Sequence, residues 1–515
     1  MTQTIAAGKG TTQSLEMSPK PQVTWNLVLL SIVLGIGGTF QYGLQVSTIS
    51  SPSEYIQKFI NQTWLDRNGF PLHDETLSLL WSVIISIYNL GGLLGALSVG
   101  YLSGRFGRKK TLLYNNITAL LGATVLGFSK ILGSFEMVML GRFLYGVSTG
   151  LGLNVHMIYT GECAPQQLRG RITITSALFA VIGKCTGLLL SLSELLGSED
   201  LWPLLMASSV FPALIQLVTL PFFPDPPRYL LIDKGDKEGC IQAMKKLWGD
   251  RDHKAEMDEM LAEKAAINGE KAKSVVELVC NRAVRWQFLT LLLVYGLMQL
   301  VGINVVYFYT YDVFYNAGIP SAQIRYVSLG MGITELLTIG LCAYMIDHVG
   351  RKALLWKSYS ILSLTLGTLT VTLSLQKNYS WMPYFSTILI FILLLSYGIG
   401  PASVSCTLTT EIFNQSYRPA AFVFCGVLNW LGLIVLGFVF PFIVQGLGSF
   451  CFIFFLAYCL VMAIFVFLFV PETKGKSILE IMEQFQHLNF GGKKKKTDKQ
   501  TDINLIFSTR FSTRF

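Results

Sequence analysis

The chain has 515 residues, of which 52% are hydrophobic and only 14% are charged, and its formal net charge is +9. An average soluble domain contains about 25% charged residues, so this composition excludes an ordinary soluble globular protein. The cations gather in short loops and in the tail rather than on one surface, which excludes nucleic acid as an expected partner.

The first 22 residues are polar and lack the order of a cleaved signal peptide, so we expect residues 1–22 to form a cytoplasmic tail. Uncharged runs follow that are long enough to cross about 30 Å of hydrocarbon. The next unit, residues 23–223, is predicted to hold six membrane helices, at 23–53, 77–101, 111–129, 137–159, 172–193 and 202–223.

The loop of residues 54–76, between the first two of these helices, contains the sequence Asn61-Gln62-Thr63. This is an N-glycosylation acceptor if the loop is extracellular. Asn61 is therefore the expected glycosylation site.

The second helix ends at a tight cationic turn. The uncharged run from Thr76 to Gly104 is followed by several cations, and Gly107 allows the backbone to turn tightly among them. Lys and Arg concentrate in cytoplasmic loops, so this turn is predicted to be cytoplasmic. The other basic loops fall on the same side of a twelve-helix count, which places both termini in the cytoplasm; the cations concerned are Arg105, Arg108, Lys109, Lys110, Arg169, Arg171, Arg351, Lys352 and Arg418.

Residues 224–284 are rich in both Lys and Glu, and we expect them to form a cytoplasmic linker of short amphipathic helices. A second helical unit, residues 285–470, follows, and residues 471–515 are expected to be a cytoplasmic tail. Six more membrane helices are predicted in the second unit, at 286–310, 326–346, 353–375, 382–410, 419–445 and 449–470.

Three features of the first helical unit return in the same order in the second. Gly107-Arg108-Lys109 returns as Gly350-Arg351-Lys352, Glu162 with Arg169 returns as Glu411 with Arg418, and Pro224-Asp225 returns as Pro471-Glu472. Each lies at the end of the corresponding helix. Parallel repeats of this kind are typical of major facilitator carriers, in which the binding site lies between the halves at mid-membrane.

The surrounding motifs are GRFGRKK at 104–110, GRFLYG at 141–146, GECAPQQLRGR at 161–171, PDPPRYLL at 224–231, QLVGIN at 299–304, DHVGRK at 347–352, TEIFNQSYRPAA at 410–421 and PETKGKS at 471–477. With these motifs the chain resembles the facilitative sugar transporters of the major facilitator superfamily, and within them the subclass that holds fructose and urate carriers. The resemblance implies an all-α polytopic membrane protein of the plasma membrane, with twelve transmembrane helices in two six-helix halves.

The repeated charges at the cytoplasmic helix ends suggest an inner gate. Ion pairs between the halves would hold the gate shut, and at ~0–1 kcal/mol each they are weak enough to open. The alternative is that these charges only set topology. The gate residues expected are Glu162, Glu411, Arg105, Arg108, Arg142, Arg169, Arg351 and Arg418.

An uncharged sugar needs neutral hydrogen-bonding groups, because an unpaired polar group in a pocket costs ~1–3 kcal/mol. The alternatives are aromatic packing for Tyr42 and Trp430, and helix–helix hydrogen bonding for Gln299 and Asn304. The substrate-binding residues expected are Gln41, Tyr42, Gln45, Gln299, Asn304, Asn429 and Trp430, which the resemblance implies, together with Glu335.

The sequence departs from the glucose carriers at several of these positions. Ala177 and Met298 replace glutamines of the resembled family, and Glu335 replaces a sugar-binding asparagine. Glu335 and Lys184 are charges inside apolar runs, where ionisable residues are functional by default. Either they pair between the halves, or they contact a polar or anionic substrate.

The function expected is uniport of a hexose such as glucose or fructose by alternating access. The position of the aspartate in proton-coupled relatives of the superfamily is here Gln45, which cannot titrate. The alternatives are a carrier of urate or another small polar solute, and a transport-dead sugar sensor.

Enzyme and ATP-binding motifs such as HExxH, the Walker loop and GxSxG are absent from the sequence, so we expect no enzyme activity, cofactor or metal. The expected partners are a small-molecule substrate, a hexose, and the lipid bilayer. The sequence indicates no particular oligomeric state.

Overall fold

The computed structural model describes residues 24–490 apart from 166–168, 251–252, 255, 259, 262–274, 309–310, 312–313, 316–317, 376–377, 414–416, 475 and 477. The expected N-terminal tail and most of the expected C-terminal tail lie outside the described residues. Every regular element within the described ranges is helical.

The N-terminal half is built from nine α-helices. The first membrane run is divided in two by Gly38, and the loop that follows it contains a helix of its own, α3, which the sequence did not indicate. The helices are α1 (Trp25–Gly37), α2 (Thr39–Ser47), α3 (Ser53–Asn68), α4 (Asp74–Phe106), α5 (Arg108–Phe128), α6 (Phe135–Cys163), α7 (Arg169–Leu190), α8 (Trp202–Ala207) and α9 (Val210–Thr219).

The linker contains η2 (Tyr229–Asp233), α10 (Lys237–Trp248), α12 (Val275–Cys280) and η3 (Arg282–Val284). The seventh membrane run is interrupted, as α13 (Arg285–Leu291), η4 (Leu292–Gly296), η5 (Met298–Val301) and α14 (Ile303–Phe308). The rest of the chain forms α16 (Ser321–Val349), α17 (Arg351–Leu375), α18 (Met382–Tyr397), η6 (Gly398–Ala402), α19 (Ser403–Ile412), α20 (Arg418–Leu447), η7 (Gly448–Cys451), α21 (Phe452–Phe469) and α22 (Ile478–Phe490).

Nine helices in the described residues are long and apolar enough to cross a membrane. Together with α6, α7 and the interrupted run from α13 to α14, they give six membrane crossings in each half, as the sequence predicts.

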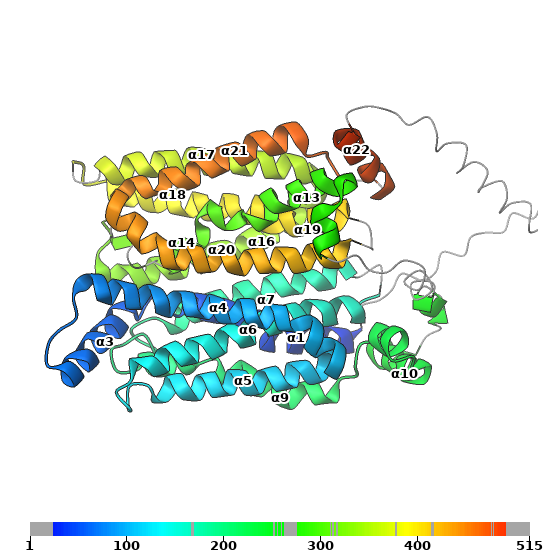
Figure 1. The fold of residues 1–515 in the computed structure, drawn as a ribbon, viewed down its shortest axis with the longest axis horizontal. Helices are drawn as coiled ribbons and strands as arrows, with labels where there is room; N and C mark the ends of the chain where they lie inside the picture. Colours follow the sequence, from blue (N-terminus) through cyan, green and yellow to red (C-terminus); the bar gives the residue numbers. More distant parts are fainter. Residues whose placement is uncertain are drawn as a thin grey trace, which may run out of the picture.

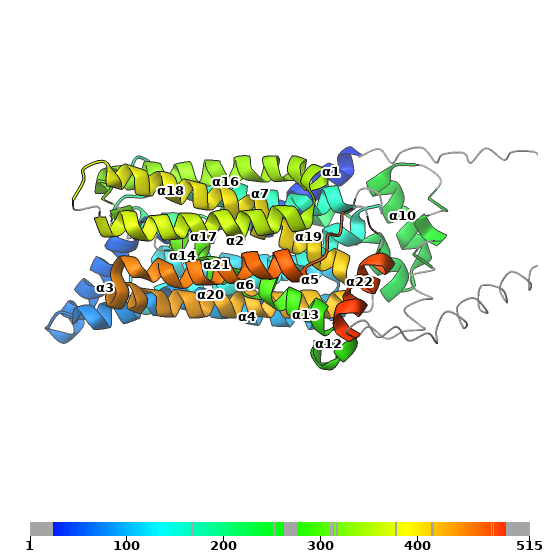
Figure 2. The ribbon, with the colours of Figure 1, turned by 90° about the horizontal axis from the view of Figure 1, so that it is seen from above.

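The two halves lie side by side and meet along two seams (Figures 1 and 2). One seam is formed by α4 and α20, and the other by α7 and α16. The helix α3 lies at one end of the bundle, and α10 and α22 lie at the opposite end (Figure 1). We call these the α3 end and the α10 end.

Glycines allow α4 and α6 to pack backbone against backbone. A Cβ atom at Gly146 would lie 2.0 Å from the carbonyl oxygen of Tyr88, and one at Gly150 would lie 2.1 Å from the carbonyl oxygen of Gly92. Lipid tails are as apolar as the protein interior, so burial of apolar side chains contributes little to the association of membrane helices. Small residues instead allow the backbones to come close enough for van der Waals packing.

We expect Gly150→Val to destabilise the fold by about 1–3 kcal/mol, because the added side chain forces backbones apart in a filled interior. The matched control is Gly161→Val in the same helix, where a Cβ atom meets no atom within 4 Å. Thermal unfolding in detergent, followed by size-exclusion chromatography, measures the difference. Equal melting temperatures for the two variants would contradict the packing account.

Candidate functional site

Three amide side chains of the C-terminal half form a hydrogen-bonded chain. Gln299 Nε2 donates to Asn429 Oδ1 at 2.6 Å, and Asn304 Nδ2 donates to Gln299 Oε1. Gln299 lies on η5 and Asn304 on α14, and between them Gly302 adopts a left-handed backbone with φ of 88°. The interruption of the helix therefore brings the two amides together. The three expected residues form one neutral hydrogen-bonding group, which we call the amide chain.

The expected aromatic residues lie where the halves meet. Trp430 on α20 is 1% exposed, and a Cβ atom at Gly92 on α4 would lie 2.3 Å from its ring. The ring centres of Tyr42 and Tyr88 each lie 6.0 Å from that of Trp430, and both pairs are T-shaped. These contacts are those of an aromatic that packs across a seam, which is the alternative left open for Trp430 and Tyr42.

Two expected residues of α2 are buried inside the N-terminal half. Gln45 is fully buried, and its Nε2 donates to Ser209 Oγ at 2.6 Å while its Oε1 accepts from Arg142 at 3.4 Å. Gln41 is 1% exposed. The hydrogen-bond partners of the Gln45 amide, Ser209 and the buried Arg142, thus both belong to the N-terminal half.

The expectation that Arg142 belongs to the cytoplasmic ring is wrong. Arg142 lies in the first turns of α6, whose first residue is beside Arg67 of α3, and it stacks over the Tyr88 ring at 4.5 Å. Glu162 lies twenty residues further along the same helix, which is a rise of about 30 Å. The twelve-helix count also places the start of the 137–159 helix on the side opposite the basic loops, so the assignment of Arg142 to the cytoplasmic ring disagreed with the predicted topology as well.

A charged pair joins the halves across the α7–α16 seam. Lys184 Nζ lies 2.7 Å from Glu335 Oε1. The second carboxylate oxygen accepts from the hydroxyl of Tyr307 on α14, and Lys184 Nζ lies 4.5 Å from the centre of the Tyr307 ring. Of the two sequence interpretations, the ion pair between the halves is the one that this structure contains. Tyr307 was not among the expected residues, although it lies one helical turn after Asn304.

The ion pairs that the structure describes for Arg108 and Arg351 at the α10 end lie within each half, whereas the gate hypothesis expected pairs between the halves. Arg108 contacts Glu162 at 2.6 Å and Asp233 at 2.8 Å, and Arg351 contacts Glu411 at 3.0 Å. Gly107 and Gly350 have φ of 85° and 95°, and these tight turns direct each arginine back onto its own half.

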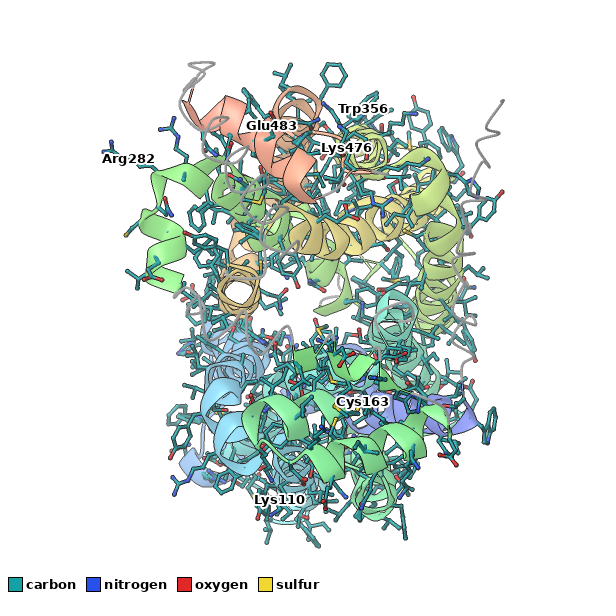
Figure 3. All side chains as sticks on the ribbon, turned by 90° about the vertical axis from the view of Figure 1, so that its right-hand side faces the viewer. Lys110, Cys163, Arg282, Trp356, Lys476 and Glu483 are labelled. Carbon is teal, nitrogen blue, oxygen red and sulfur yellow. The ribbon has the colours of Figure 1, made fainter. Side chains whose placement is uncertain are left out.

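Other members of the expected gate behave differently. Arg105 packs on Phe106 and contacts the hydroxyl of Tyr101, whereas the side chains of Arg169 and Arg418 lie outside the described residues. Seen from the α10 end, Lys110 and Cys163 lie in one half, and Trp356 and Lys476 lie in the other (Figure 3).

At the α3 end, the halves are joined directly. Arg325 Nη2 donates to the hydroxyl of Tyr55 at 3.0 Å, and the hydroxyl of Tyr326 donates to Glu194. This hydrogen bond holds the pKa of Glu194 below its usual range. Asn61 lies on α3 at this end, and its Oδ1 accepts from the backbone N–H of Leu72 at 3.0 Å. Among the described residues, the contacts between the halves therefore lie at the α3 end and along the two seams.

The sugar transporter family, described as "Sugar (and other) transporter", matches residues 30–485. The chain is 45% identical over 464 residues to solute carrier family 2, facilitated glucose transporter member 11 of Homo sapiens, covering 90% of this chain and 94% of the relative. It is 40% identical to member 9 of Homo sapiens, with 90% and 86% covered, and 38% identical to member 5 of Equus caballus, with 90% and 92% covered.

Among solved structures, the chain is similar to the proton:xylose symporter bound to 6-bromo-6-deoxy-D-glucose, with a TM-score of 0.73 and 19% identity over 90% of this chain and 100% of the other. The inward open xylose transporter from E. coli gives a TM-score of 0.71 at 19% identity, with 89% and 99% covered. At this identity the likeness shows the fold, which is the all-α major facilitator fold.

We expect Arg351→Ala and Glu411→Ala to be non-additive, with a coupling of about 1 kcal/mol, because the two side chains are partly buried partners. The cross pair Arg108→Ala with Glu411→Ala is the control and should be additive. Double-mutant cycles on unfolding in detergent measure both. Coupling in the cross pair, without coupling between Arg351 and Glu411, would favour ion pairs between the halves.

Proposed function

Because this chain belongs to the sugar transporter family, whose members are transporters and not enzymes, we propose that it carries hexoses such as glucose or fructose by facilitated diffusion. The observation that carries the proposal is the similarity to facilitated glucose transporters over 90% of the chain, which includes both halves. Alternating access requires both halves, because the substrate site of such a carrier lies between them.

The amide chain supports a neutral, hydroxyl-bearing substrate. Gln299, Asn304 and Asn429 offer both N–H donors and carbonyl acceptors without a net charge. A sugar hydroxyl can donate and accept, so it can replace the hydrogen bonds that the amides now make with each other. The substrate then removes no hydrogen bond without supplying another.

The contacts between the halves support an inward-facing state. Positive charge favours a cytoplasmic location for the α10 end, which carries Arg108, Arg351 and the linker. In the plasma membrane, this orientation places both termini in the cytoplasm and α3 outside the cell. The halves are joined at the α3 end, while the ion pairs that the structure describes for Arg108 and Arg351 at the α10 end each lie within one half.

Two alternative functions remain testable. The ammonium group of Lys184 favours an anionic solute such as urate, but its pairing with Glu335 cancels that charge. The exposed Ala177, in place of a sugar-binding glutamine, favours a sugar sensor that binds without transport.

We expect the purified chain in proteoliposomes to take up radiolabelled D-glucose or D-fructose in preference to urate. Asn429→Ala should weaken uptake by about 5- to 150-fold, which corresponds to ~1–3 kcal/mol for an unpaired partner in the amide chain. The matched control is Asn68→Ala on the exposed end of α3, which should transport like the wild type. Saturable binding of a hexose without uptake would identify a sensor, and uptake of urate alone would overturn the hexose proposal.

We expect Asn61 to carry an N-linked glycan, because the proposed topology places α3 outside the cell. The loop between α17 and α18 lies at the same end and holds a second acceptor, Asn378-Tyr379-Ser380. Enzymatic deglycosylation should therefore increase the electrophoretic mobility of Asn378→Gln and leave the double variant Asn61→Gln with Asn378→Gln unchanged. Protease cleavage within residues 54–76 in sealed inside-out vesicles would contradict the topology.

A further inference from the structure

The Lys184–Glu335 pair has no counterpart among the other described contacts that join the halves. Its two side chains are only 10% and 13% exposed. The Lys130–Asp200 pair, which lies within the N-terminal half at the α3 end, is 36% and 94% exposed. A charge buried without a partner costs several kcal/mol, and such a group changes its protonation state instead. The charge state of Glu335 therefore depends on Lys184.

The environment of Glu335 is otherwise built from weak acids. Among the residues that the structure describes, the titratable groups near it are Cys185 on α7, Tyr307 on α14, Tyr397 on α18 and Tyr42 on α2, together with Lys184. Each of the four weak acids can only be neutral or negative, so Lys184 is the member of this group that compensates the carboxylate.

The pair lies where the two halves approach closely. A Cβ atom at Gly332 on α16 would lie 3.0 Å from the Sγ of Cys185 and 3.2 Å from its Cα. Gly332 is one helical turn before Glu335, and Cys185 is the neighbour of Lys184. Rocking of the halves moves a point of close helix contact less than it moves the helix ends. We therefore expect the ion pair to persist while the two ends open and close in turn.

Protonation of Glu335 is disfavoured when Lys184 is present and favoured when it is absent. In the wild type, ammonium and carboxylate sum to zero, and adding a proton to Glu335 leaves a buried positive charge, which is disfavoured. Without Lys184, the lone carboxylate is negative, and adding a proton makes the site neutral, which is favoured.

Building on the proposed function, we infer that Lys184 is the positioning residue that keeps transport independent of protons, by holding Glu335 as a carboxylate. Loss of Lys184 makes Glu335 a site that binds a proton from the water on one side and releases it on the other. Flux then requires one proton and falls by up to about tenfold per pH unit on the alkaline side.

The test compares the wild type, Lys184→Met, and Lys184→Met combined with Glu335→Gln, in proteoliposomes that contain a trapped pH indicator. The probe is radiolabelled D-glucose or D-fructose, whichever the wild type carries. We expect flat flux without acidification for the wild type, and pH-dependent flux with acidification for Lys184→Met. The acidification should vanish in the double variant, and Lys130→Met should behave like the wild type.

A flat flux without acidification in Lys184→Met would overturn the inference, and so would acidification by the wild type. If Lys184→Met does not fold, the exchanged pair, Lys184→Glu with Glu335→Lys, decides. This variant keeps both charges, so pH-dependent flux in it would overturn the inference and flat flux would support it.

A second readout does not depend on transport, so it separates a failure of this inference from a failure of the proposed function. Infrared difference spectra report the carbonyl stretch of a protonated carboxylic acid. We expect no such band from Glu335 in the wild type near neutral pH, a band in Lys184→Met, and its loss in the double variant. If the three proteins show this pattern but the wild type carries no hexose, only the proposal of hexose transport is refuted. If Lys184→Met lacks the band, the role of Lys184 is refuted.

Discussion

Hydrocarbon offers no hydrogen-bond partner to a peptide group, and this constraint governs the rest of the structure. Backbone groups within the membrane must pair internally, which favours helices, and helix breaks are tolerated only inside the protein. The breaks here obey that rule. At the break between α1 and α2, Gln216 Nε2 donates to the carbonyl oxygen of Val33 at 3.0 Å. At the break before α14, the amide chain gathers around Gln299. Polar side chains therefore cluster at the places where the helices are interrupted.

Each half is held together by many internal contacts, whereas the two halves meet along narrow seams. Within the N-terminal half, α4 and α6 approach through glycines, and Arg108 binds both Glu162 and Asp233. The C-terminal half repeats the arrangement, with Arg351 on Glu411. Two units that are rigid in this way can rock against each other, and the ion pairs described at their α10 ends, Arg108 with Glu162 and Arg351 with Glu411, each lie within one half. The seams instead combine close packing, at Gly92 against Trp430, with one buried ion pair.

The sequence alone determined the architecture and the family. Apolar run length, the position of Lys and Arg, and the repeat of Gly107-Arg108 as Gly350-Arg351 depend only on local composition and order, so they could be read before any coordinates. The members of the amide chain were named through the family resemblance, whereas the hydrogen bonds that join Gln299 to Asn304 and Asn429 are seen only in the structure. The polarity of an intramembrane residue is visible in the sequence even when its partner is not.

Only the tertiary structure decided which groups meet. The gate arginines were assigned to contacts between the halves because a repeat of charges gives the helix end but not the direction of the side chain. In the structure, the arginines that follow the turns at Gly107 and Gly350 each pair with a glutamate of their own half. Arg142 is different, because the predicted helix 137–159 already has Arg142 near the end opposite Glu162, and the structure confirms that position. The pairing of Lys184 with Glu335 depends on two helices that are 151 residues apart in sequence, and a contact of that separation is set by packing alone.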